Sequence, residues 1–256
     1  MKHKVKNLTG FTIGATDGEI GKVIEFYFDD ETWTVRYLII KTGGWLSGRQ
    51  VLIAPQAIIM PDWREKVLHV NLTKDQVKAS PDIDTSKPVS RQQELALYNH
   101  YPWGSYWGGG LWAGGLGTTG MMMPINTSVE EAIEKQKAKA EKPSNDDPHL
   151  RSTDTVTGYN IKATDGTIGD VEDFIINDAT WKIDFIEVDT GNWFSAKKVV
   201  LSPSMIKKIK WDTAEVVINA TVEQVKDSPE YSAAIHLDDE YEAVLKSYYE
   251  RLANRK

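Results

Sequence analysis

The sequence predicts a mainly β protein made of two small β-barrels. The first observation is an internal repeat, in which residues 10–81 align without a gap with residues 158–229, at a constant offset of 148 positions. In this alignment 28 of 72 positions are identical, which is typical of a duplicated structural unit. The second observation is that each copy consists of short runs rich in β-branched and aromatic residues, bounded by turn residues. We call the two copies repeat 1 and repeat 2.

Turns and strands follow the same order in both repeats. Asp17-Gly18 and Asp165-Gly166 predict tight hairpin turns, because Asp and Gly tolerate the positive φ that such turns need. The strand-like runs of repeat 1 read KVIEFYFD, TVRYLIIKT, RQVLIAP and KVLHVNL. Four to six such strands in about 70 residues fit a small barrel, which removes exposed sheet edges by closing on itself.

A short helix and an amphipathic helix are expected after each barrel. Thr73 and Thr221 are suited to cap the short helices TKDQVKASP and TVEQVKDSP at their N-termini. Near the C-terminus, apolar residues recur with helical spacing and form one face. This face consists of Tyr241, Val244, Leu245, Tyr248 and Leu252. Repeat 1 keeps Leu97 and Tyr101 at the positions of Leu245 and Tyr249.

The stretch between the repeats has a different composition. Residues 101–124 are rich in glycine and contain Trp103, Trp107 and Trp112, and a capping box at 128–131 then opens a charged, helix-like run. We therefore divide the chain into repeat 1 with its trailing helix (1–101), a Gly/Trp-rich and then helical linker (102–150), and repeat 2 with its trailing helix (151–256).

Composition excludes several classes of function. The chain of 256 residues has no cysteine, so disulfides, thiolate catalysis and cysteine metal sites are ruled out. Its net charge of −7 and the lack of a basic stripe argue against a nucleic-acid partner. The N-terminus has no apolar signal region, and no run approaches the roughly 18 apolar residues of a membrane span. We expect a cytoplasmic protein.

The duplication provides an internal test for catalytic residues. None of the five histidines has a histidine at the equivalent position, so no histidine base or metal ligand is common to both repeats. Ser47 and Ser195 recur, but no shared base accompanies them. The recurrent Asp30 and Asp178 lie in turn contexts, where Asp caps backbone groups. We predict no catalytic, cofactor-binding or metal-binding residues, and we assign Asp17, Gly18, Asp165 and Gly166 as structural turn residues.

Tryptophan recurs more firmly than any polar group. The loop TGGWLSGRQVLI at 42–53 is matched by TGNWFSAKKVVL at 190–201, which keeps Trp45 as Trp193. We read this loop as a connection between two strands, with the Trp as its anchor. Tryptophan is also favoured at interaction hot spots. The candidate interaction residues are Trp45, Trp193, Trp103, Trp107 and Trp112.

The run DGEIGKVIEFYFDDETWTVRYLIIKTGGWLSGRQVLI, followed by LTKDQVKASPDID, resembles the PRC-barrel family. That family includes the cytoplasmic domain of the photosynthetic reaction-centre H subunit and the C-terminal domain of the ribosome maturation factor RimM. The resemblance covers both repeats and implies a small β-barrel with binding or assembly roles and no general catalytic mechanism. The chain shows neither an N-terminal transmembrane helix nor a RimM-type N-terminal domain.

These observations favour a non-enzymatic tandem PRC-barrel that acts as a protein-binding or assembly adaptor. Its partner would be another protein or a second copy of the chain, as in a homodimer. One alternative is a peripheral membrane protein anchored through residues 101–124, although this segment lacks basic flanks and helical periodicity. Another is a regulator that binds a small molecule or a metal, or an enzyme whose site the sequence does not reveal.

Overall fold

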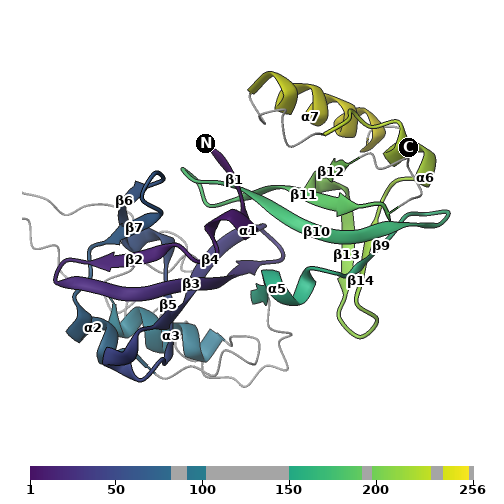
Figure 1. Cartoon of the computed structure of the whole chain (residues 1–256). Coiled ribbons are helices and arrows are strands. Elements are labelled where there is room, and N and C mark those ends of the chain that lie inside the picture. Colours follow the sequence, from purple (N-terminus) through teal and green to yellow (C-terminus); the bar gives the residue numbers. More distant parts are fainter. Residues whose placement is uncertain (82–90, 102–149, 192–197, 232–238, 254–256) are drawn as a thin grey trace, which may run out of the picture.

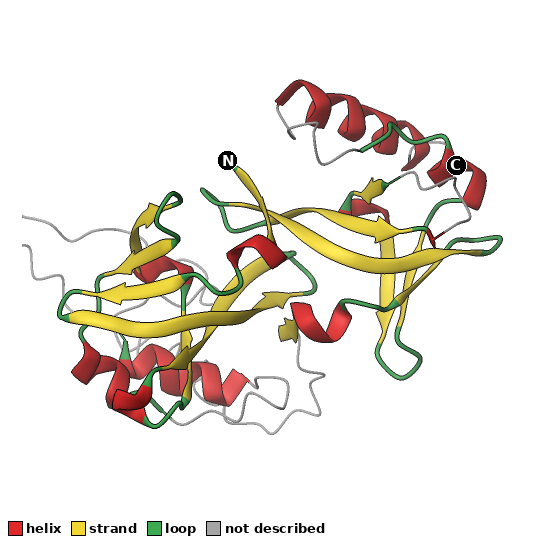
Figure 2. Ribbon diagram, in the orientation of Figure 1, coloured by secondary structure: helices red, strands yellow, loops and turns green. Residues whose placement is uncertain are grey.

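The computed structural model describes residues 1–81, 91–101, 150–191, 198–231 and 239–253 (Figure 1). It is mainly β and contains two mixed sheets of seven strands each, one for each repeat, which confirms the predicted class (Figure 2). The segments rich in β-branched and aromatic residues form the strands, and several of them, such as β4 (Thr34–Thr42) and β12 (Val199–Leu201), contain runs of consecutive buried residues. Ile13, Phe26, Leu38 and Leu68 lie among the fully buried side chains of repeat 1.

The two sheets have the same strand order. In repeat 1 the order is β5-β4-β3-β2-β7-β6, and in repeat 2 it is β12-β11-β10-β9-β14-β13. The pairs β2–β7 and β9–β14 are parallel, and the other neighbours are antiparallel. The strands of repeat 1 are β2 (Thr12–Ala15), β3 (Gly18–Asp29), β4 (Thr34–Thr42), β5 (Gln50–Ile53), β6 (Ile58–Asp62) and β7 (Val67–Val70). Those of repeat 2 are β9 (Asn160–Lys162), β10 (Thr167–Asn177), β11 (Ile183–Asp189), β12 (Val199–Leu201), β13 (Ile206–Lys210) and β14 (Glu215–Ile218).

Closure of each sheet into a barrel was predicted, and this detail is wrong for the part of the chain that the structure describes. The hydrogen-bonded path ends at β5 and β6 in repeat 1, and at β12 and β13 in repeat 2. These end strands are consecutive in the chain. They are joined by the 3₁₀ turns η2 (Pro55–Ala57) and η4 (Pro203–Met205), which redirect the chain so that the two strands do not form a ladder. Among the described residues, each repeat is therefore a curved sheet that does not close into a barrel.

The seventh strand of each sheet comes from the other repeat. Strand β1 (Lys2–Lys4) pairs with β10 of repeat 2, and β8 (Leu150–Ser152) pairs with β3 of repeat 1. Each short strand continues into a single helical turn, α1 (Val5–Leu8) or α5 (Thr153–Val156), before the chain enters its own repeat. In Figure 1 the two long strands β3 and β10 accordingly extend toward each other. The two repeats are thus connected by exchanged strands.

Helices cover the ends of the sheets. Thr73 caps α2 (Lys74–Lys78) and Thr221 caps α6 (Val222–Lys226), each with a full capping box. The longer helices are α3 (Arg91–His100) and α7 (Asp239–Ala253). In α7, Leu245 and Tyr249 are buried, whereas Val244 is 50% exposed, so the buried face is rotated from the expected one. The Tyr249 hydroxyl donates to the Val200 carbonyl at 2.7 Å and fixes the helix on β12.

Two recurrent glycines allow the close crossing of the long strands. A Cβ at Gly21 would lie 2.1 Å from the Lys41 carbonyl oxygen, and one at Gly169 would lie 2.0 Å from that of Asp189. No side chain fits at such distances, so the tight approach of β3 to β4 and of β10 to β11 requires glycine. The short 3₁₀ helix η1 (Gly44–Leu46) then forms the loop after β4.

Candidate interaction site between the two repeats

The hairpin tips of the two repeats are hydrogen-bonded to each other. The Val35 amide donates to the Trp181 carbonyl at 2.8 Å, and the Ile183 amide donates to the Trp33 carbonyl at 2.7 Å. Both tryptophans have positive φ, near 55°, which turns their carbonyls toward the other repeat. Phe28 and Phe174 extend the contact as a tilted pair with centroids 5.5 Å apart. The recurrent residues at 33 and 181 therefore join the repeats.

Two equivalent side-chain clusters reinforce this junction. In one, the Arg151 guanidinium lies 3.8 Å from the ring centroid of Trp211, and its Nε donates to Asp30 at 3.1 Å. In the other, the His3 ring stacks on Trp63 at 3.9 Å, and its Nε2 lies 3.0 Å from a carboxylate oxygen of Asp178. His3 and Arg151 are equivalent positions of the exchanged strands. Each cluster combines residues of both repeats and of an exchanged strand.

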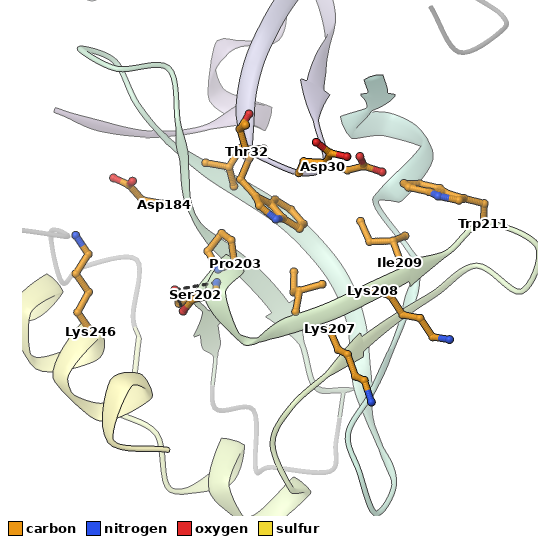
Figure 3. Close-up of a pocket in the computed structure, with 15 residues that line it drawn as sticks. Asp30, Thr32, Asp184, Ser202, Pro203, Lys207, Lys208, Ile209, Trp211 and Lys246 are labelled. Carbon is orange, nitrogen blue, oxygen red and sulfur yellow. Dashed lines mark hydrogen bonds between the residues drawn. The ribbon is translucent and has the colours of Figure 1, made fainter. Parts of the chain in front are cut away.

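A groove of about 620 Å³ opens beside the Arg151 cluster. One wall is the turn at 30–33 of repeat 1, and the other is the η4 turn and β13 of repeat 2 (Figure 3). Trp33, Ile183, Pro203, Ile209 and Trp211 supply apolar surface. The groove also has charged residues of both signs at its rim. These are Asp30, Glu31, Asp184, Lys207, Lys208 and Lys246.

Three of the six rim charges are already paired within the chain. Asp30 accepts from Arg151, Asp184 accepts from Lys2, and Lys246 lies 2.5 Å from Glu242. Lys207 and Lys208 are exposed and take part in no ion pair among the described residues. Glu31 is also exposed and has no ion pair among the described residues. Lys207 and Lys208 are therefore the unpaired positive charges at this rim, and they are adjacent on β13.

A second, buried charge cluster lies on strands β10 and β11 of repeat 2, apart from the groove. Asp173 and Glu187 are directly opposite each other on β10 and β11, and they are 3% and 1% exposed. Lys4 from the exchanged strand contacts Glu187 at 2.5 Å, and Lys198 contacts it at 2.9 Å. Burial alone would raise the pKa of Glu187, but the hydrogen bonds from Lys4 and Lys198 outweigh it and lower the pKa.

Among the described residues, no cationic side chain forms an ion pair with the Asp173 carboxylate. Burial raises its pKa to about 6, although the backbone amides of Phe174 and Lys6 donate to the carboxylate. Its Oδ2 atom is buried without a hydrogen-bond partner in the part of the chain that the structure describes. A carboxyl group with this pKa exchanges a proton near neutral pH. Because the side chain is only 3% exposed, we expect its protonation to change the stability of the fold rather than to act on a bound substrate.

The structure shows the contacts of Trp45 and of the two turn aspartates that the sequence singled out. Trp45 is half-buried, and its indole Nε1 donates to the Ile20 carbonyl at 2.8 Å, while Lys74 lies over the ring at 5.5 Å. Its polar atom is therefore used inside the fold. The Asp17 carboxylate accepts from the Lys74 amide at 2.9 Å, and Asp165 accepts from the Val222 amide at 2.8 Å. Both aspartates thus cap helices as well as shaping turns.

The glycines that follow these aspartates differ. Gly18 has φ +133°, a backbone conformation that side chains rarely adopt, whereas Gly166 is not among the positive-φ glycines. Trp193 and the linker residues Trp103, Trp107 and Trp112 lie outside the described residues, as does the linker segment 102–149.

The described residues can be searched for a metal site and for a membrane-spanning helix. Within these ranges no group of three or more His, Asp and Glu side chains is placed to hold a metal ion. Among the helices that the structure describes, none has the length and apolar content needed to cross a membrane.

Sequence reasoning missed the exchanged strands and hence the junction. Residues 2–4 and 150–152 lie just outside the aligned repeats, and three residues are too few to show a strand period. A signal was nevertheless present, because the identical pair Thr9 and Thr157 extends the alignment by one position upstream at the same offset. Continuing the alignment would have placed His3 opposite Arg151 and Lys4 opposite Ser152.

Comparison with known families identifies the first repeat. Residues 2–84 match the PRC-barrel domain, so this part of the chain is a PRC-barrel domain and the resemblance noted in the sequence is confirmed for repeat 1. The match does not extend to repeat 2, which is related to repeat 1 by the internal identity and by the same strand order. No curated protein matches the chain.

Proposed function

With a PRC-barrel domain as its first repeat, we propose that this chain is an adaptor that binds a partner protein in the groove between its repeats. The PRC-barrel domain itself points to a non-catalytic module. The observation that carries the proposal is that both repeats line the groove, with Trp33 from repeat 1 and Ile209 and Trp211 from repeat 2. A partner held there would contact both copies of the duplicated unit at once.

The structure of the junction supports this role. Exchanged strands, the backbone bonds between Trp33, Val35, Trp181 and Ile183, and the Arg151 cluster all hold the groove walls at a fixed separation. A preformed site costs less ordering entropy on binding than a flexible one. Aromatic residues with apolar surface beside charged rims are also the usual composition of protein interaction sites.

Site-directed photo-crosslinking in the native host tests this function. A photoreactive amino acid at Lys208 samples the groove, and one at Met60, the equivalent residue of repeat 1, is the matched control. We expect a discrete protein adduct from position 208, identified by mass spectrometry and competed by the unmodified chain. Equal adducts from both positions, or none from position 208, would overturn the groove as the binding site.

A further inference from the structure

Strand β13 has one free edge, and this edge borders the groove. Residues Ile206–Lys210 form a ladder with β14, and β13 is the last strand of the sheet. Within the described residues, the Ile206 amide donates to the Pro203 carbonyl in the η4 turn, and no other backbone group of β13 is hydrogen-bonded outside the ladder. A free edge offers amides and carbonyls to an additional strand, which is a common way to bind an extended peptide.

The two faces of β13 differ in chemistry. In Figure 3, Lys207 and Lys208 extend to one side of the strand, whereas Ile209 extends to the side of Asp30. A register shift between Ile206 and Lys208 accounts for two neighbouring lysines on one side. Ile209 lies with Trp33 and Trp211 among the residues that line the groove. A strand added here would have one face on lysines and the other on apolar surface.

The equivalent edge in repeat 1 is built differently. Strand β6 has Ile59 and Met60 where β13 has the two lysines, and these side chains are 64% and 57% exposed. It also has Pro61 in place of Ile209, and proline has no N–H for a strand ladder. Strand β13 therefore has two positive side chains and a backbone N–H that strand β6 lacks, and it is the better edge for binding an acidic strand.

We propose that β13 binds an extended acidic segment of the partner protein by strand addition. Alternate side chains of that segment are carboxylates that pair with Lys207 and Lys208, and the intervening ones are apolar and enter the groove. The charge complementarity rests on these two lysines, which have no ion partner among the described residues while most other rim charges do. This inference rests on the proposed adaptor function and adds the chemistry of the partner.

Binding of designed peptides to the full chain tests the inference. The probes are fluorescein-labelled peptides of about eight residues that alternate Glu with Val, Lys with Val, or Ser with Val. We expect the Glu/Val peptide to raise fluorescence anisotropy and to bind at least tenfold more tightly than the other two. Its binding should weaken with added salt, and backbone amides of β13 should gain protection from hydrogen exchange.

Charge reversal provides the decisive variants. Lys207→Glu combined with Lys208→Glu should weaken the Glu/Val peptide at least tenfold and favour the Lys/Val peptide. The matched control, Ile59→Glu with Met60→Glu, places the same charges at the equivalent edge and should leave binding unchanged. Equal binding of all three peptides, or an unchanged affinity in the Lys207/Lys208 variant, would overturn the inference.

The two proposals fail separately. If position 208 cross-links a host protein but the Glu/Val peptide does not bind β13, the acidic-strand inference is wrong and the adaptor function stands. If the peptide binds and no host protein cross-links at position 208, the adaptor function is wrong.

Discussion

Repeats 1 and 2 share a fold, but they place residues of different charge at one equivalent buried position, which is Glu187 in repeat 2 and Ile39 in repeat 1. In repeat 2 the buried Glu187 is held by Lys4 from the exchanged strand β1, and Asp173 lies opposite it. In repeat 1 the equivalent of Glu187 is the buried Ile39, and the equivalent of Lys4 is Ser152, which donates to Glu25 at 2.7 Å. Glu187 and Glu25 each have a partner on an exchanged strand, whereas the Asp173 carboxylate accepts only from backbone amides. The difference indicates that the residue on the exchanged strand and the acid that it contacts change together between the two repeats.

A second pair of positions follows the same rule. Lys2 contacts Glu242 of α7 in repeat 2, whereas repeat 1 has Leu150 in place of Lys2. There the equivalent carboxylate, Glu94, accepts from the Tyr37 hydroxyl at 3.3 Å. Repeat 2 has Phe185 where repeat 1 has Tyr37. Where repeat 1 lacks the lysine, the Tyr37 hydroxyl donates to the buried Glu94 carboxylate instead. This is expected because a buried carboxylate without a hydrogen-bond partner destabilises the fold.

The largest effect should come from placing the repeat 1 residue at position 4. Lys4→Ser leaves Glu187 with only the half-exposed Lys198, and breaking a buried ion pair costs about 3 kcal/mol of unfolding free energy. Urea unfolding followed by circular dichroism measures it. The double variant Lys4→Ser/Glu187→Ile completes the exchange and should recover most of the loss. A single variant as stable as the original chain would contradict the pairing.

The next effect concerns pH. Because the pKa of Asp173 is raised to about 6, the folded chain keeps a proton that the unfolded chain releases at lower pH. Its contribution to stability is therefore full below the ordinary aspartate pKa of 3.8 and is lost as the pH rises through about 6. Asp173→Asn should remove this loss and be more stable than the original chain by about 2 kcal/mol at pH 7, with a much smaller gain at pH 4.

The equivalent residue of repeat 1 is the control for this pH effect. Burial also raises the pKa of Glu25, but the hydrogen bond from Ser152 opposes it. Glu25→Gln should therefore change stability in the same direction and by less. Unfolding free energies at pH 4, 5, 6 and 7 give both differences. A gain for Asp173→Asn that is independent of pH would contradict the assignment.

A smaller effect is expected at the two junction clusters. Arg151 is 7% exposed and combines an ion pair with a stacked tryptophan, so Arg151→Ala should cost about 2 kcal/mol. His3 is more exposed, and His3→Ala should cost about 0.5 to 1 kcal/mol. Thermal unfolding of both variants compares them. The reverse order would show that the two clusters do not play equivalent roles.

The smallest effect should be the same in both repeats. Asp17→Ala and Asp165→Ala each remove one carboxylate acceptor from the first amide of a short helix. Each should cost about 0.5 to 1 kcal/mol, as for other helix caps. Chemical denaturation of the two variants provides the measurement, and their combination should be additive because the sites lie in different repeats. A clear excess in one repeat would indicate a second role for that aspartate.

The sequence by itself determined the duplication, the mainly β class, the turn at Asp17-Gly18 and the capped short helices. These features depend on neighbours in the chain, such as Thr73 with Gln76 or Asp17 with Gly18, so local pattern is enough to show them. Recurrence of the loop tryptophan also marked a structural anchor, and Trp45 indeed donates to Ile20.

Only the tertiary structure decided the exchange of strands, the open sheets and the groove. Strand β3 has 12 residues, and β2 pairs only with its first part, so Tyr27–Asp29 retain a free edge that β8 fills. Nothing local to residues 2–4 or 150–152 specifies which repeat they join, because strand pairing connects residues far apart in sequence. The junction, and with it the groove, is formed by contacts between the repeats such as the Arg151–Asp30 ion pair and the hydrogen bond from Val35 to Trp181.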